Sequence, residues 1–130
     1  MAESGSDSTA DVFGLDGAVI DRTAEKAEME TDRLVGALDI LHAELIGRHS
    51  NLERTTEYVT EGGVRAYRVE EPVWDDFLDE FDFESTTEAA VRYAHTEQAR
   101  LLFAKSVRGD DHFGPREEGV VVGIDTAEQF

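Results

Sequence analysis

The sequence predicts an α+β fold: a single small domain with two long helices and one short helix packed on a β-hairpin plus a C-terminal strand. Apolar residues recur at helical spacing in three segments, a Gly-Gly pair separates two runs of strand-forming residues, and a Val-rich run lies near the C-terminus. The length of 130 residues suits one domain. Residues 12–130 are expected to form it, and the polar residues 1–11 to form a flexible N-terminal segment.

Apolar residues near the N-terminus are interrupted by two glycines, and we expect them to form a short strand or a docking segment. They are Phe13, Leu15, Val19 and Ile20. No predicted element covers them, so they offer a second contact surface for a partner, with Phe13 and Leu15 as its first residues.

The first long helix is predicted over residues 21–47. Asp21 suits the N-cap position, and Gly47 suits the end of a helix. Leucines spaced four, three and four residues apart fall on one face of this helix: Leu34, Leu38, Leu41 and Leu45. This leucine stripe has the period of a coiled-coil seam, so it is either a packing face for the sheet or a dimer interface.

A β-hairpin is predicted over residues 54–61 and 64–70, joined by a Gly-Gly loop. A two-residue loop of this type suits a primed turn because both glycines can take positive φ. The register places a Tyr-Tyr pair on the face expected to pack on the core. It places a Glu57–Arg68 ion pair on the opposite face, which is expected to be solvated.

A short helix is predicted to begin at Pro72, because proline suits the first turn of a helix. Large apolar side chains follow at positions i, i+3, i+4 and i+7: Trp74, Phe77, Leu78 and Phe81. Acidic residues fill the remaining positions, so the segment is amphipathic.

The second long helix is predicted over residues 85–107. It starts with a capping box of Ser85 and Glu88, and Glu88 also forms an i,i+4 pair with Arg92. The final strand, centred on residues 120–124, does not alternate between apolar and polar residues. We therefore expect it to be buried on both faces.

The chain is acidic along its whole length. It has 30 acidic and 12 basic residues, for a formal net charge of −18, and 2 of the basic residues are lysines. Such a lysine-poor acidic coat is typical of proteins from extreme halophiles, where it remains hydrated in molar salt. We interpret the negative charge as a hydration layer that gives no information about a ligand.

The protein is therefore expected to lose structure at low salt. At about 1 M salt the Debye length is only about 3 Å, so the repulsion between acidic residues is screened, whereas dilute buffer leaves it in place. Circular dichroism in dilute buffer and in molar KCl measures the difference. An unchanged spectrum would contradict the halophile interpretation.

Composition excludes several kinds of chemistry. The absence of cysteine excludes disulfides, thiolate zinc sites, iron–sulfur clusters and cysteine nucleophiles. No apolar run approaches the roughly 20 residues needed to cross a bilayer, and the N-terminus lacks the pattern of a signal peptide. We expect a soluble, cytoplasmic protein with no membrane partner.

The histidines are not expected to bind a metal, because residues two apart on a helix point in nearly opposite directions. This separates His42 from Glu44, and His95 from Glu97. No metal or cofactor is therefore predicted. The loop 108–118 gathers arginines, acids and a histidine, so an alternative is a metal- or anion-dependent enzyme that uses this loop.

The leucine-bearing helix and the hairpin after it resemble the last helix and the wing of a winged-helix domain, over residues 34–69. The resemblance implies a DNA-binding transcriptional regulator with four arginines near phosphates: Arg48, Arg54, Arg65 and Arg68. Glutamates are interleaved with these arginines, whereas DNA binding draws on a basic patch. Nucleic acid is therefore the less favoured partner.

The favoured prediction is a non-enzymatic cytoplasmic protein that acts by association. It forms a homodimer or is a subunit of a larger assembly, and its partner is a second copy or another protein. The predicted interaction residues are the leucine stripe and the N-terminal apolar pair: Leu34, Leu38, Leu41, Leu45, Phe13 and Leu15.

Overall fold

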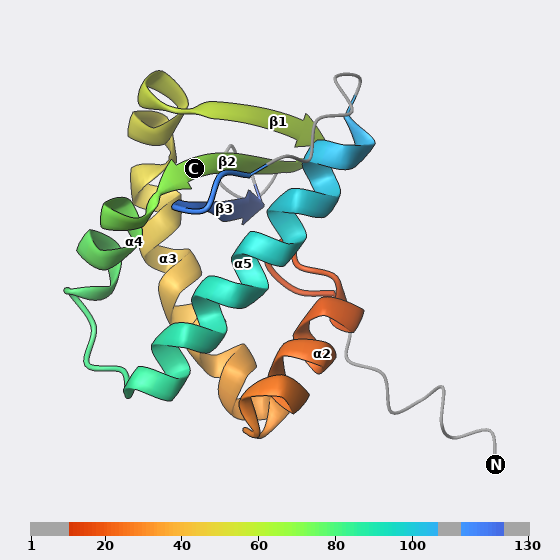
Figure 1. Cartoon of the computed structure of the whole chain (residues 1–130), viewed down its shortest axis with the longest axis vertical. Coiled ribbons are helices and arrows are strands. Elements are labelled where there is room, and N and C mark those ends of the chain that lie inside the picture. The colour runs from red at the N-terminus through yellow and green to blue at the C-terminus, as the bar shows by residue number, and fades with distance from the viewer. Residues whose placement is uncertain (1–10, 107–112, 124–130) are drawn as a thin grey trace, which may run out of the picture.

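The computed structural model describes residues 11–106 and 113–123. Within these ranges it confirms the predicted α+β class and the single small domain (Figure 1). The elements are α2 (Gly17–Ala27), α3 (Thr31–Thr55), β1 (Glu57–Glu61), β2 (Val64–Glu70), α4 (Glu71–Leu78), α5 (Ser85–Lys105) and β3 (Glu117–Gly123). None of the described helices is both long enough and apolar enough to span a bilayer. The segment predicted to be flexible, residues 1–11, lies outside the described residues except for Asp11.

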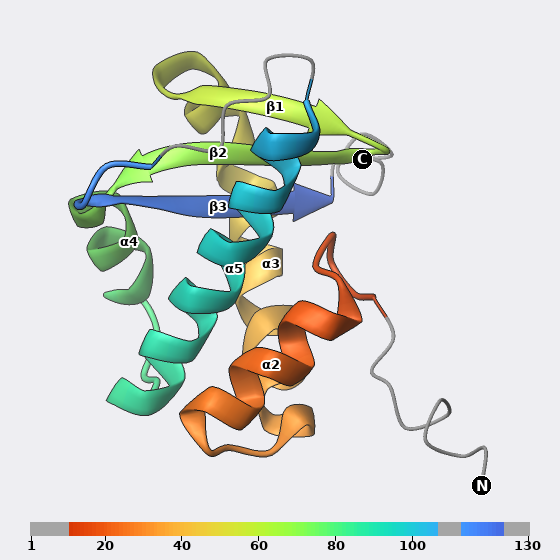
Figure 2. The same cartoon turned by 45° about the vertical axis from the view of Figure 1, so that its right-hand side comes forward.

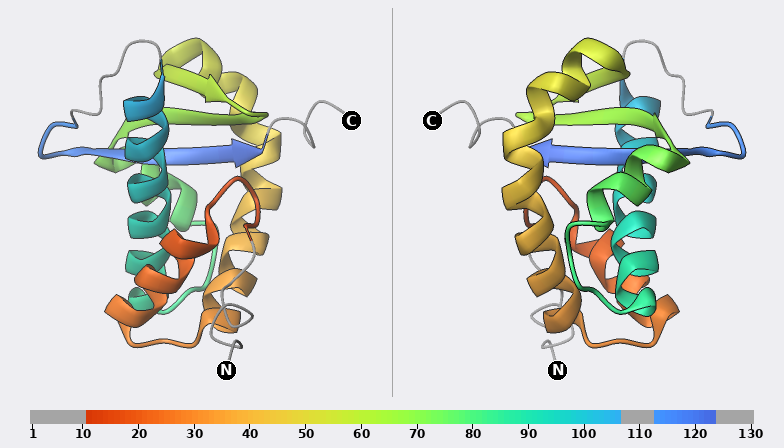
Figure 3. Two further views of the ribbon diagram at one scale, coloured as in Figure 1. Left: turned by 90° about the vertical axis from the view of Figure 1, so that its right-hand side faces the viewer. Right: turned by 90° about the vertical axis from the view of Figure 1, so that its left-hand side faces the viewer.

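The three strands form one antiparallel sheet in the order β1-β2-β3. Helix α5 crosses one face of this sheet and α3 crosses the other, as Figures 2 and 3 show from different sides. Helix α2 lies beyond β3 and packs between α3 and α5, while α4 packs against β2 and β3. Val120 and Val122 of β3 join the core on the α3 side, and Val121 joins the core on the α5 side.

The predicted helix over residues 21–47 is wrong, because the chain forms two helices there. Helix α2 ends at Ala27, and Glu28 takes a left-handed conformation with φ of 56°. The Glu28 N–H donates to the Glu25 carbonyl and the Met29 N–H to the Ala24 carbonyl, which is the Schellman pattern. Helix α3 then continues past the predicted end and stops at Thr55.

The start of α2 also differs from the prediction, which placed the N-cap at Asp21. The helix begins at Gly17, whose N–H donates to the Asp11 carboxylate at 2.8 Å. The capping box predicted for α5 is not formed either. Ser85 is the first residue of that helix, Glu84 is its N-cap, and no side chain caps it.

The hairpin has the predicted register, with Tyr58 opposite Tyr67, and its two loop glycines take φ of 56° and 79°. The prediction of a solvated second face is wrong, because α5 covers that face. Arg68 pairs with Glu57 at 2.9 Å as predicted. It also lies between the rings of Phe103 and Phe113, with its guanidinium carbon 4.8 and 5.1 Å from their centroids.

The outer edge of β3 is closed by side chains instead of a fourth strand. In this register the N–H groups of Gly119, Val121 and Gly123 point away from β2. They donate to Thr96 Oγ1 at 3.0 Å, His95 Nδ1 at 2.9 Å and His42 Nε2 at 3.3 Å, respectively. The indole N–H of Trp74 donates to the Gly119 carbonyl at 2.9 Å. Three N–H groups and one carbonyl that an edge strand would leave unpaired are thus satisfied within the domain.

Candidate functional site

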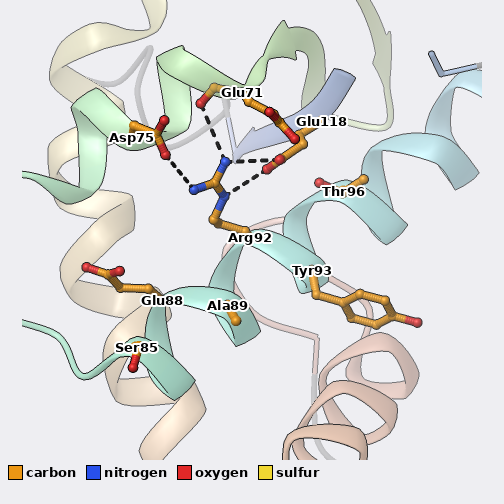
Figure 4. Close-up of a pocket in the computed structure, with 9 residues that line it drawn as sticks. All are labelled: Glu71, Asp75, Ser85, Glu88, Ala89, Arg92, Tyr93, Thr96 and Glu118. Atoms are coloured by element: carbon orange, nitrogen blue, oxygen red, sulfur yellow. Dashed lines mark hydrogen bonds and ion pairs between the residues drawn. The ribbon is translucent and has the colours of Figure 1, made fainter. Parts of the chain in front are cut away.

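Arg92 joins three elements at the surface of the domain (Figure 4). From α5, its Nε and Nη2 atoms donate to the two carboxylate oxygens of Glu118 on β3, each at 2.9 Å. Its Nη1 atom donates to Asp75 of α4 at 2.8 Å. Burial alone lowers the pKa of Arg92, but its hydrogen bonds to Glu118 and Asp75 outweigh that effect and raise the pKa above its ordinary value.

A cavity of about 620 Å³ opens beside Arg92. Four carboxylates and one guanidinium line it, so its walls carry an excess of negative charge. Its lining residues are Glu71, Asp75, Ser85, Glu88, Ala89, Arg92, Tyr93, Thr96 and Glu118.

A second cavity of about 490 Å³ lies between α2 and α5 and shares Ser85, Ala89 and Tyr93 with the first. Ser85, Ala89 and Tyr93 are spaced four residues apart on α5, so the two cavities adjoin along this strip of the helix, one on its α4 side and one on its α2 side. We call the two cavities together the α5 groove. Its far end is mainly apolar and is lined by Thr23, Lys26, Ala27, Thr86 and Ala90. The Lys26 ammonium sits 5.3 Å from the centre of the Tyr93 ring at this end.

Sequence reasoning missed the α5 groove because it paired Glu88 with Arg92. Arg92 turns instead toward Glu118 and Asp75. In the part of the chain that the structure describes, the Glu88 carboxylate has no ion-pair partner, and it lines the groove. Ala89 is exposed in the fold, and its short side chain leaves the surface of α5 open there, but the sequence alone does not show this exposure.

Arg92→Ala is expected to lower the free energy of unfolding by about 2 kcal/mol, because half-buried Glu118 would lose both of its charged hydrogen bonds. The matched control is Arg33→Ala. The Arg33–Glu84 pair is 58% and 72% exposed, so its loss is expected to cost less than about 0.5 kcal/mol. Denaturant unfolding in molar KCl measures both values. Equal effects of the two substitutions would contradict the role given to Arg92.

The predicted interaction residues are mostly inside the domain. The leucine stripe, Leu34, Leu38, Leu41 and Leu45, is fully buried in the core of the single chain. Leu15 is fully buried too, and Phe13 is half-buried against the ring of His42, with centroids 5.1 Å apart. The stripe is thus a packing face of α3, and in this fold it presents no surface to a second chain.

His42 and His95 serve the sheet edge. His95 is fully buried and its Nδ1 accepts a hydrogen bond, so the proton of the neutral ring is on Nε2. That Nε2 atom has no hydrogen-bond partner among the described residues. Desolvation by burial lowers the pKa of His95 to about 3, and it also lowers that of His42. The described ranges contain no group of three or more histidines and acids that could hold a metal ion.

The loop 108–118, which the enzyme alternative requires, is described from residue 113 onward, and residues 108–112 lie outside the described ranges. Glu117 and Glu118 belong to β3, and Glu118 is held by Arg92. Arg116 is 85% exposed and lies 3.7 Å from the Glu71 carboxylate. The described part of the loop thus contributes to the acidic wall of the α5 groove.

The arginines of the winged-helix interpretation are largely engaged by acids. Arg48 contacts Glu44 at 2.6 Å and also pairs with Glu80. The other contacts are Arg65 to Glu53 at 3.1 Å, Arg68 to Glu57 at 2.9 Å, and Arg54 to the Asn51 side chain at 3.5 Å. Within the described residues, acidic groups thus offset much of the positive charge that phosphate binding would use.

The arrangement defines a class: a small α+β domain with helices on both faces of a three-stranded antiparallel sheet and an acidic groove along one of those helices. The chain belongs to the family described as Domain of unknown function (DUF8048), whose model matches residues 14–124. That match covers every described helix and strand. No curated protein and no solved structure matches the chain.

Proposed function

We propose that this protein is a non-enzymatic subunit that binds another protein through the α5 groove. One observation supports the proposal above the others: two cavities adjoin along α5 at the surface of the domain, whereas the leucine stripe is buried. Residues from α4, α5 and β3 are tied together at Arg92, so the acidic wall of the groove is preformed.

Charge favours a different protein over a second copy as the partner. Each chain carries a formal net charge of −18, and the groove adds local negative charge. Two identical acidic surfaces repel each other unless salt screens them, whereas a basic surface is attracted. The proposal keeps the remaining acids as a hydration layer suited to a salt-rich cytoplasm.

Site-specific photo-crosslinking in cells of the native host tests this proposal. A photoreactive amino acid replaces Ala89 in the groove or, as a matched control, the exposed Ala43 on α3. We expect a discrete conjugate with another protein from position 89 and none from position 43. The same products from both positions, or no product from position 89, would contradict the proposal. A conjugate of two identical chains would favour self-association instead.

A further inference from the structure

We propose that the α5 groove accepts a basic, amphipathic segment of the partner, with a lysine or arginine side chain at the acidic end and apolar side chains at the α2 end. This inference rests on the proposed function, because it names the chemistry of the partner that the groove would bind. Two observations support the inference: the apolar lining of the cavity between α2 and α5, and the negative charge of the adjoining cavity beside Arg92.

The apolar end fixes the amphipathic character of the segment. The methyl groups of Ala27, Ala89 and Ala90 line this end, and Tyr93 lines both cavities. Apolar side chains placed there would cover surface that water now contacts, which favours binding at any salt concentration. A bare cation or a small amine would leave this half of the groove empty.

The acidic end of the groove indicates that the bound segment carries positive charge. Arg92 is already shared between Glu118 and Asp75, so it has little capacity to attract an anion. Glu88 has no ion-pair partner within the described ranges, and Figure 4 shows its side chain on the α4 side of the helix, where Asp75 also lies. A lysine or arginine from the partner would supply a cation for Glu88, the carboxylate of this wall that no described arginine or lysine pairs with.

Salt affects the contributions of the two ends of the groove to binding differently. At about 1 M ionic strength the Debye length is about 3 Å, so charges attract there only in direct contact. The acidic end then selects a basic residue at short range, and the apolar end supplies most of the affinity. Binding should therefore weaken only modestly when the salt concentration is raised above about 1 M, where the fold is retained.

Selection from a random peptide library displayed on phage, against the full chain in molar KCl, tests the inference. Enriched peptides are expected to combine lysine or arginine with apolar residues. For the leading synthetic peptide, Ala89→Trp should weaken binding at least tenfold by filling the groove, and Glu88→Gln about two- to fivefold. The matched controls Ala43→Trp and Glu25→Gln, at exposed positions that do not line the groove, should leave affinity unchanged.

Circular dichroism of each variant separates lost binding from lost folding. Enrichment of peptides without basic residues, no enrichment at all, or equal losses in the control variants would overturn the inference. The photo-crosslinking experiment keeps the two proposals distinguishable. A conjugate from position 89 together with enriched neutral or acidic peptides would leave the proposed function standing and reject the basic segment.

Discussion

Gly119→Ala is expected to destabilise the protein by about 3 kcal/mol, as overpacking of a well-packed interior does. An added Cβ at this position would clash with the Cβ of Ala99. It would also stand 3.2 Å from the His95 carbonyl oxygen and the Thr96 Cα, both of which belong to the α5 backbone. Relief therefore requires moving the helix away from β3. Denaturant unfolding in molar KCl measures the loss.

Two further variants show whether packing is the cause. Gly36→Ala on α3 introduces a Cβ with nothing within 4 Å, so it should stabilise the protein by about 0.5–1 kcal/mol through helix propensity. Ala99→Gly removes the nearest clashing atom and should recover part of the Gly119→Ala loss, despite its own cost in the helix. An unchanged free energy of unfolding for the Gly119→Ala single variant would contradict the close packing of α5 against β3.

Acid is expected to unfold the protein through His95, over the interval between about pH 6.5 and about pH 3. The pKa of His95 falls from its ordinary 6.5 to about 3 on folding. Across that interval the unfolded chain binds the proton and the folded chain does not, so the free energy of unfolding decreases as the pH falls. The slope is about 1.4 kcal/mol per pH unit for one such group. Above pH 6.5 the ring is neutral in both states, so His95 no longer lowers the free energy of unfolding.

The structural reason is that Nδ1 of His95 accepts a hydrogen bond from the Val121 N–H. Protonation would place a second hydrogen between these two atoms and break that bond. His95→Gln keeps an acceptor near that N–H and removes the titration. The difference between the unfolding curves of the native protein and His95→Gln, measured from pH 7 to pH 4, isolates the effect from that of the carboxylates. Parallel curves for the two proteins would refute it.

Local patterns predicted the elements that local interactions determine. The Gly-Gly hairpin and its register follow from turn geometry. The short helix with Pro72 in its first turn follows from the spacing of Trp74, Phe77 and Leu78, although it ends before Phe81. The break at Glu28 left no such trace, because a glutamate occupies the left-handed position where glycine is usual. The apolar spacing also continues from Ala27 to Leu34 across the break.

The site could not be predicted, because it depends on contacts between distant parts of the chain. Arg92 has a sequence neighbour of suitable charge in Glu88, yet it pairs with Glu118, which only the packing of β3 against α5 brings near. The hairpin face expected to be solvated is covered for the same reason. The buried histidines likewise satisfy β3 from two different helices, an arrangement that residue spacing does not encode.

The side chains that close the outer edge of β3 also limit how copies of this protein can polymerise. A fibre grown by strand addition needs a free edge on each side of the sheet, one to give and one to receive. In the described sheet only β1 is a free edge strand, so edge-to-edge pairing joins two molecules through their β1 strands and cannot continue further. Concentrated solutions in brine, where mutual repulsion is screened, should therefore contain no fibres of folded molecules joined edge to edge.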